Sequence, residues 1–200
     1  MFAPGLQNPS GAGAPVIGLV GPSGVGKTTL LECTVATLRA WAVDVGVVKH
    51  SSRAVQVDRP GKDSDRLYRA GAAAVALAMP GQIATFVRRD PTRPSLSEAL
   101  AALPADLDLV LVEGFAWEPI PRWVLLPPDG SDLRGDLALD RAEILGVLRA
   151  PERPEGRRPH FEPTTVETLA RMLLRQAGLA LPIEVSGLSL SRDQSAAGSA

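Results

Sequence analysis

The chain has 200 residues, of which 45% are hydrophobic and 22% charged, and its formal net charge is −1. This length and composition are typical of one folded domain, and the small net charge argues against a nucleic acid or an anionic membrane as partner. The single cysteine, Cys33, excludes an intramolecular disulfide and a cysteine-rich metal site.

Neither a secretory signal nor a membrane-spanning helix is expected. The residues before Ala14 do not combine a basic start with an apolar core. No apolar run approaches the roughly 18 residues that a transmembrane helix needs. The cytoplasm is therefore the expected compartment.

In chain order, the sequence predicts a disordered leader over residues 1–13, one folded domain over 14–179 and a disordered tail over 180–200. Short apolar or β-branched runs predict strands at 15–20, 43–49, 74–79, 82–88, 107–112, 122–126 and 144–148. Segments of helical composition or period predict helices at 27–40, 62–70, 95–103 and 164–177. Strands that alternate with helices predict an α/β fold with a mostly parallel sheet.

The segment between the first strand and the first helix has the sequence Gly21-Pro-Ser-Gly-Val-Gly-Lys-Thr28, which matches the P-loop pattern G-x-x-x-x-G-K-[ST]. Glycines let backbone amides approach phosphate closely, and the helix directs its partially positive N-terminus at the same anion. Lys27 is expected to bind the β- and γ-phosphates, and the Thr28 hydroxyl to bind Mg²⁺. The fold expected is therefore a P-loop NTPase of three α/β/α layers with some additional β structure. The candidate nucleotide-binding residues here are Gly21, Pro22, Ser23, Gly24, Val25, Gly26, Lys27, Thr28 and Thr29.

A P-loop also needs an acidic partner for Mg²⁺ and the attacking water. The most apolar expected strand, 107–112, ends at Glu113-Gly114, which makes Glu113 the candidate. The alternative is that Glu113 only caps a loop. Asp108 lies inside the strand, too early to face the phosphates.

Four segments together resemble the molybdopterin-guanine dinucleotide biosynthesis adapter proteins, the MobB family. They are the P-loop segment 21–32, the Val47-Val48-Lys49-His50 segment, the Asp58-Arg-Pro-Gly-Lys-Asp-Ser-Asp block followed by 69–72, and the Val-Glu-Gly-Phe115 block followed by Glu118-Pro-Ile-Pro-Arg122. The last two blocks are the specific ones, and the resemblance covers about residues 14–126.

The resemblance implies that the chain binds GTP with Mg²⁺, hydrolyses it slowly, and assists the enzyme that joins GMP to molybdopterin. It also implies a homodimer that docks with the molybdenum cofactor guanylyltransferase and with molybdenum-insertion proteins. Molybdopterin itself is a further candidate ligand.

Site residues follow from the resemblance position by position. Asp58 matches an acidic position near Mg²⁺ and joins Lys27 and Glu113 as a candidate catalytic residue, with a solvated loop carboxylate as the alternative. Asp63, Arg69 and Gly114 are carried over as nucleotide-site residues. Asp63 alternatively caps the helix of 62–70, and Arg69 alternatively binds a partner or only solvent.

His50 is also carried over, but the several histidines that commonly follow it in the family are missing, so a histidine cluster is not expected. Trp117 is an interface anchor or packs on its own domain, and the Pro- and Arg-rich loop 149–158 is a partner contact or solvated. Guanine recognition rests on the resemblance, since no aspartate follows the strand 144–148 closely and Glu152 is the candidate in its place.

Other functions remain open at this point. The same fold hosts ATP-dependent small-molecule kinases and ligases, and an adapter that holds a nucleotide without turnover differs only in rate. A nickel-delivery GTPase would need more than two histidines and one cysteine as ligands.

Overall fold

The protein is represented by a computed structural model that describes residues 13–51, 58–89, 95–131, 143–152 and 157–181. The predicted leader and tail fall outside these residues, apart from the positions adjoining the domain. Within the described residues the strands are β1 (Val16–Val20), β2 (Val45–Lys49), β3 (Ala74–Met79), β4 (Gln82–Val87), β5 (Leu109–Glu113), β6 (Arg122–Leu126) and β7 (Ile144–Arg149). The helices are α1 (Lys27–Ala40), α2 (Asp63–Arg69), α3 (Leu96–Ala101) and α4 (Pro163–Ala177).

Five strands form one parallel sheet in the order β2-β5-β1-β6-β7. In β1 and β5 every residue is buried, because helices cover both faces and leave no side of these strands to water. The register pairs Lys49 at the end of β2 with Glu113 at the end of β5. All five strands therefore end at one edge of the sheet, where α/β folds of this kind bind ligands.

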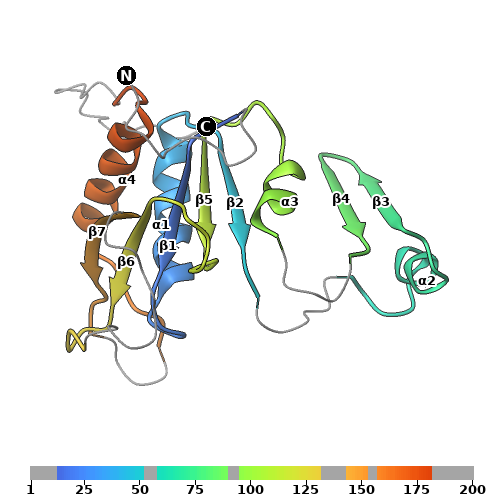
Figure 1. The fold of residues 1–200 in the computed structure, drawn as a ribbon, viewed down its shortest axis with the longest axis horizontal. Coiled ribbons are helices and arrows are strands. Elements are labelled where there is room, and N and C mark those ends of the chain that lie inside the picture. Colours follow the sequence, from blue (N-terminus) through green and yellow to red (C-terminus); the bar gives the residue numbers. More distant parts are fainter. Residues whose placement is uncertain (1–12, 52–57, 90–94, 132–142, 153–156, 182–200) are drawn as a thin grey trace, which may run out of the picture.

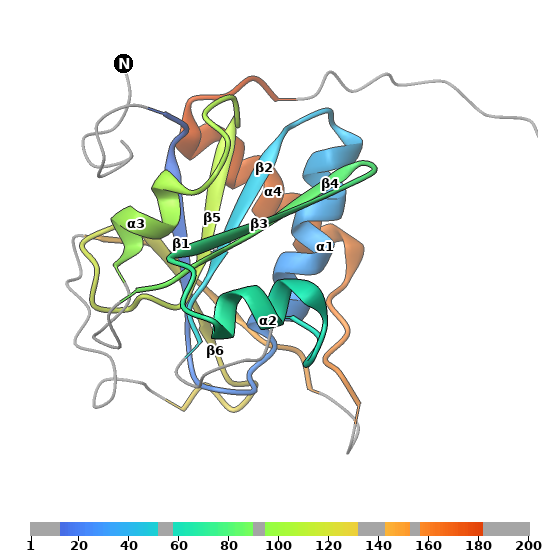
Figure 2. The same ribbon diagram turned by 90° about the vertical axis from the view of Figure 1, so that its right-hand side faces the viewer.

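The predicted three-layer fold is confirmed. Helices α1 and α4 pack on one face, where Leu30 and Leu173 join Ile17 and Leu111 in a single cluster. Helix α3 covers the other face with Leu96 and Leu100. Figure 2 shows α3 and α1 on opposite sides of the strands. At the start of α3, the Ser95 hydroxyl accepts a hydrogen bond from the Glu98 amide and caps the helix.

The additional β structure is a separate antiparallel hairpin of β3 and β4, joined by the Pro80-Gly81 turn. We call α2, β3 and β4 together the hairpin arm. Figure 1 shows this arm at one end of the molecule, beyond α3 and away from the parallel sheet. No residue of α2 is buried, and Ile83 at 75% and Leu67 at 59% are among the exposed large apolar side chains.

The element bounds agree with the sequence predictions to within a few residues, and the prediction for α1 is matched at both ends. The stretch 127–143, for which no element was predicted, lies between β6 and β7, and its residues 132–142 are outside the described ranges. Among the described residues, no helix combines the length and apolarity needed to cross a membrane.

Candidate functional site

The P-loop connects the end of β1 to the first turn of α1, at the edge where the parallel strands end. Gly26 is the N-cap of α1 with φ of 111°, a left-handed conformation that side chains other than hydrogen rarely tolerate. A Cβ atom built on Gly26 would lie 2.5 Å from the Pro159 side chain. Glycine is thus required here for both conformation and space, and the residues after β7 are brought against the loop.

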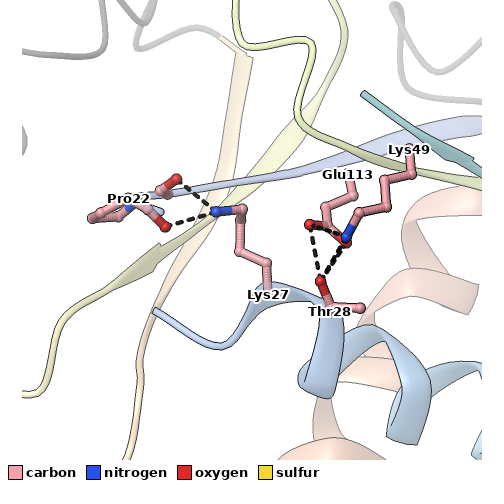
Figure 3. A network of polar contacts seen from close by, with 6 residues as sticks. Pro22, Lys27, Thr28, Lys49 and Glu113 are labelled. Carbon is pink, nitrogen blue, oxygen red and sulfur yellow. Dashed lines mark hydrogen bonds and ion pairs between the residues drawn. The ribbon is translucent and has the colours of Figure 1, made fainter. Parts of the chain in front are cut away.

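Lys27 is bonded into the P-loop itself. Its ammonium donates to the carbonyl oxygens of Gly21 at 2.9 Å and Pro22 at 2.7 Å (Figure 3). Burial lowers the pKa of Lys27, an effect that Glu113 opposes and Lys49 reinforces. Neighbouring groups therefore balance the positive charge of Lys27 only in part, which suits a side chain that receives an anionic ligand.

The other side chain predicted from the motif, Thr28, meets Glu113. The Thr28 hydroxyl lies 3.0 and 2.9 Å from the two carboxylate oxygens, and Glu113 is only 8% exposed. Strand β5 and helix α1 thus bring together two residues 85 positions apart, both of which the sequence analysis named as candidate metal ligands. A hydroxyl and a carboxylate are oxygen ligands, which Mg²⁺ prefers.

These two groups would not hold a metal ion alone. Among the residues that the structure describes, no cluster of three or more histidine, cysteine, aspartate or glutamate side chains could hold one. Mg²⁺ commonly completes its shell with substrate phosphates and water. The donor set therefore fits a cation that arrives with a phosphate ligand.

Lys49 is a site residue for which the sequence analysis predicted no role. Its ammonium donates to the Thr28 hydroxyl at 2.8 Å and to both Glu113 oxygens at 2.9 Å. Figure 3 shows all three side chains converging, while Lys27 points to the opposite side. The sequence signals are a basic residue that ends a β-branched strand and the place of Lys49 in the Val47-Val48-Lys49-His50 segment of the resemblance.

His50 follows Lys49 and lies beside the end of β5. Its amide donates to the Glu113 carbonyl at 2.9 Å, and its ring makes edge contacts with Phe115 and Trp117 at centroid distances of 5.2 and 4.8 Å. A Cβ on Gly114 would lie 3.0 Å from the His50 Cβ. Trp117 packs on its own domain while 37% exposed.

Arg122 explains why the Glu-Pro-Ile-Pro-Arg block accompanies Glu113. Arg122 is 1% exposed, and its guanidinium donates to the carbonyl oxygens of Ala116, Glu118 and Ile120. It also pairs with the Glu143 carboxylate at 2.5 Å. This buried cation fixes the loop that follows Glu113, a structural role that the motif alone does not reveal.

The remaining predicted residues are not brought to the P-loop by any described contact. Asp63 is 94% exposed at the side chain and pairs with Arg66, so it does not cap α2, which begins after Lys62. Arg69 pairs with Asp65 within α2. Figure 1 places α2 at the far end of the hairpin arm.

Asp58 lies just before the arm, where its carboxylate accepts from the Arg59 amide at 2.7 Å. Glu152 is exposed and follows β7, whose end shares the sheet edge with the P-loop. Residues 52–57 and 153–156, which adjoin these two positions, lie outside the described ranges. The roles predicted for both carboxylates stay predictions.

Comparison with known proteins gives consistent matches. A family model described as molybdopterin guanine dinucleotide synthesis protein B matches residues 16–142. The molybdopterin-guanine dinucleotide biosynthesis adapter protein of Haemophilus influenzae is 45% identical over 112 residues, which cover 56% of this chain and 62% of that protein. The adapter protein of Escherichia coli is 36% identical over 140 residues, which cover 68% of this chain and 79% of that protein. The matched part thus spans less than two thirds of the Haemophilus protein's length.

Solved structures agree with these matches. A crystal structure of molybdopterin-guanine biosynthesis protein B superposes with a TM-score of 0.58 at 29% identity and covers 80% of this chain and 98% of that chain. A structure of Bacillus subtilis MobB has a TM-score of 0.58 at 25% identity, with the same coverage.

Proposed function

This chain belongs to the molybdopterin guanine dinucleotide synthesis protein B (MobB) family, and we propose that it binds GTP with Mg²⁺, hydrolyses it slowly and serves as an accessory protein in the formation of molybdopterin guanine dinucleotide. The observation that carries the proposal is the meeting of the P-loop, Lys27 and the Thr28–Glu113 pair at one sheet edge. Each of these groups has a counterpart in the chemistry of a nucleoside triphosphate.

In this proposal the chain's own residues bind and orient the nucleotide. The P-loop amides and the N-terminus of α1 hold the phosphates, and the Lys27 ammonium binds the β- and γ-phosphate oxygens. Thr28 and Glu113 hold the metal and its water, with Asp58 as a second acidic residue. When bound, Mg²⁺ neutralises negative charge on the β- and γ-phosphate oxygens.

Hydrolysis forms a bond from a water oxygen to the γ-phosphorus and breaks the bond to the β–γ bridging oxygen. Glu113 accepts a hydrogen bond from the attacking water. No arginine among the described contacts reaches the P-loop side chains, which is in keeping with slow turnover, because an arginine in that place accelerates GTP hydrolysis by about 10³–10⁵-fold.

Guanine is proposed as the base from family membership. Glu152 is the candidate acceptor for the guanine N1–H and amino group, because it follows β7 at the sheet edge that carries the P-loop. The partners proposed are the guanylyltransferase that completes the dinucleotide and molybdenum-insertion proteins, with molybdopterin as a further ligand.

A homodimer is proposed through the hairpin arm. A two-stranded hairpin is only marginally stable alone, and this one exposes Ile83 at 75% and Val87 at 42% on the same face. A second copy of the arm offers a chemically matching apolar surface, and it would shield these side chains from water.

The test is a binding and hydrolysis panel with GTP, GDP, GMP and ATP in the presence of Mg²⁺. We expect GTP to bind well above ATP and phosphate release to be slow. Lys27→Ala should weaken GTP binding at least tenfold, since losing a charged hydrogen bond costs about 1.5–3 kcal/mol. Lys62→Ala, a lysine at the start of the hairpin arm, is the matched control and should bind as the wild type does.

Preference for ATP, or turnover only after a small acceptor is added, would replace this proposal with a P-loop kinase or ligase. Nucleotide binding that survives Lys27→Ala unchanged would remove the P-loop from the mechanism altogether.

A further inference from the structure

The Lys49 ammonium lies among the oxygen atoms that the proposed function assigns to Mg²⁺. It is 2.8 Å from the Thr28 hydroxyl and 2.9 Å from each oxygen of Glu113. The Glu113 carboxylate is almost fully buried, and a buried carboxylate needs a compensating cation. Lys49 supplies that positive charge from the neighbouring strand, where it is the register partner of Glu113.

An ammonium and a metal ion compete for these oxygens. Mg²⁺ binds oxygen ligands at about 2.0–2.1 Å in near-octahedral geometry through their lone pairs. The Lys49 ammonium donates to all three oxygens, so it occupies lone pairs that a metal ion would use. Two like charges at this separation also repel each other.

We propose that Lys49 is a built-in counter-ion at the metal position, which holds Thr28 and Glu113 together and withdraws as Mg²⁺ enters with the nucleotide. The Glu113 carboxylate remains paired with a positive charge throughout this exchange, because one cation replaces another. The exchange also lowers the affinity for the metal ion, because the three hydrogen bonds of Lys49 must be broken first. The inference rests on the proposed function and adds a regulation of the same site.

The two lysines of the site differ in the way this exchange requires. Lys49 is the last residue of β2, its side chain is 52% exposed, and solvent can receive its ammonium. Lys27 is held by two carbonyl oxygens of the P-loop itself and points away from the Thr28–Glu113 pair (Figure 3). Lys49 is therefore the lysine that can leave without opening the P-loop.

The test compares Mn²⁺ affinity in the presence of saturating GDP, measured from the free Mn²⁺ signal in electron paramagnetic resonance. GDP is chosen because it has no γ-phosphate for Lys49 to contact. We expect Lys49→Met to bind Mn²⁺ about tenfold or more tightly than the wild type, because the competing cation is gone. Lys49→Arg should return the affinity toward the wild-type value, and Lys62→Met should not change it.

A second readout uses the wild-type protein and does not depend on any variant folding. The chain has three lysines, Lys27, Lys49 and Lys62, so the ¹³Cε signals of labelled lysine are few enough to assign. The Lys49 signal should change little with GDP alone and shift when Mg²⁺ is added to the GDP complex, while that of Lys62 should not.

Equal or weaker Mn²⁺ binding by a folded Lys49→Met protein, or a Lys49 signal that ignores Mg²⁺, overturns the exchange while leaving nucleotide binding intact. If the wild type binds neither GDP nor GTP with either metal, the proposed function itself fails, and the exchange fails with it. The two failures are thus distinguished by the wild-type titration alone.

Discussion

Strands β1 and β5 bury all five of their residues, whereas no residue of β3 or β4 is fully buried. The parallel sheet with α1, α3 and α4 therefore has an interior that water does not reach, and the hairpin arm has none of its own. Only one face of the hairpin is half-buried, and the face that carries Ile83 and Val87 gains little from burial. The sheet thus holds the P-loop at its edge, whereas the arm leaves the apolar side chains exposed that the proposed dimer contact requires.

Charged side chains follow the same division. Near the sheet edge, Arg122 and Glu113 are buried and each contacts several polar groups. In the arm, the Asp63–Arg66 pair is 94% and 73% exposed. Exposed pairs contribute about 0–1 kcal/mol, whereas a buried charge that loses its partner is costly. The two regions should therefore respond very differently to the loss of an arginine.

The largest effect is expected for Arg122→Met, which should lower the free energy of unfolding by about 3–5 kcal/mol. The substitution leaves the Glu143 carboxylate and several loop carbonyls without their donor. Urea denaturation measures the change, and Arg66→Met in the hairpin arm is the control, with an expected loss below about 1 kcal/mol. Equal losses for both variants would contradict the division between the regions.

The next largest effect is the loss of stability when a buried apolar residue, Leu111, is replaced, compared with replacement of the exposed Ile83. Leu111→Ala should cost roughly 2–5 kcal/mol at any protein concentration, because Leu111 is 2% exposed within the main core. Ile83→Asp should leave the monomer's stability within about 0.5 kcal/mol, since Ile83 is 75% exposed. Its effect should appear in self-association, weakened about tenfold if Ile83 is a central contact.

Denaturation at two protein concentrations, with sedimentation analysis, separates these outcomes. A concentration-independent loss for Ile83→Asp comparable to that of Leu111→Ala would show that the arm is part of the domain's own core. No change in either measurement would remove Ile83 from the proposed dimer contact.

The sequence predicted the parts of this comparison that depend on local patterns. Apolar runs and helical periods located the strands and helices, and the glycine-rich motif located the loop between β1 and α1. The position of Glu113 at the end of β5 also follows from the sequence, because an apolar run that ends in a carboxylate is itself a local pattern. In each case the pattern that predicts the feature lies within a short stretch of consecutive residues.

Lys49 and Arg122 show where such reasoning ends. The contact of Lys49 with Glu113 joins residues 64 positions apart and exists only because β2 pairs with β5. The role of Arg122 depends on the path of a loop that folds back onto it. Conversely, Asp63 and Arg69 match the family block, but the sequence does not reveal that α2 lies in the arm.

The smallest expected effect concerns the pKa of Lys27, the lysine of the P-loop. Burial lowers the pKa of Lys27 below its ordinary value of 10.5, so Lys27 should lose its proton at a lower pH than an ordinary lysine. The folded state disfavours the charged form, and the linked stability therefore rises with pH between the folded pKa and 10.5. The ¹³Cε signal of Lys27, assigned with Lys27→Arg, measures this titration directly.

Bound phosphate should raise the Lys27 pKa again, because the anion favours the ammonium. A Lys27 signal that titrates at or above 10.5 without nucleotide would mean that the P-loop carbonyls compensate its charge fully, and that the site holds no uncompensated charge for an anion to neutralise.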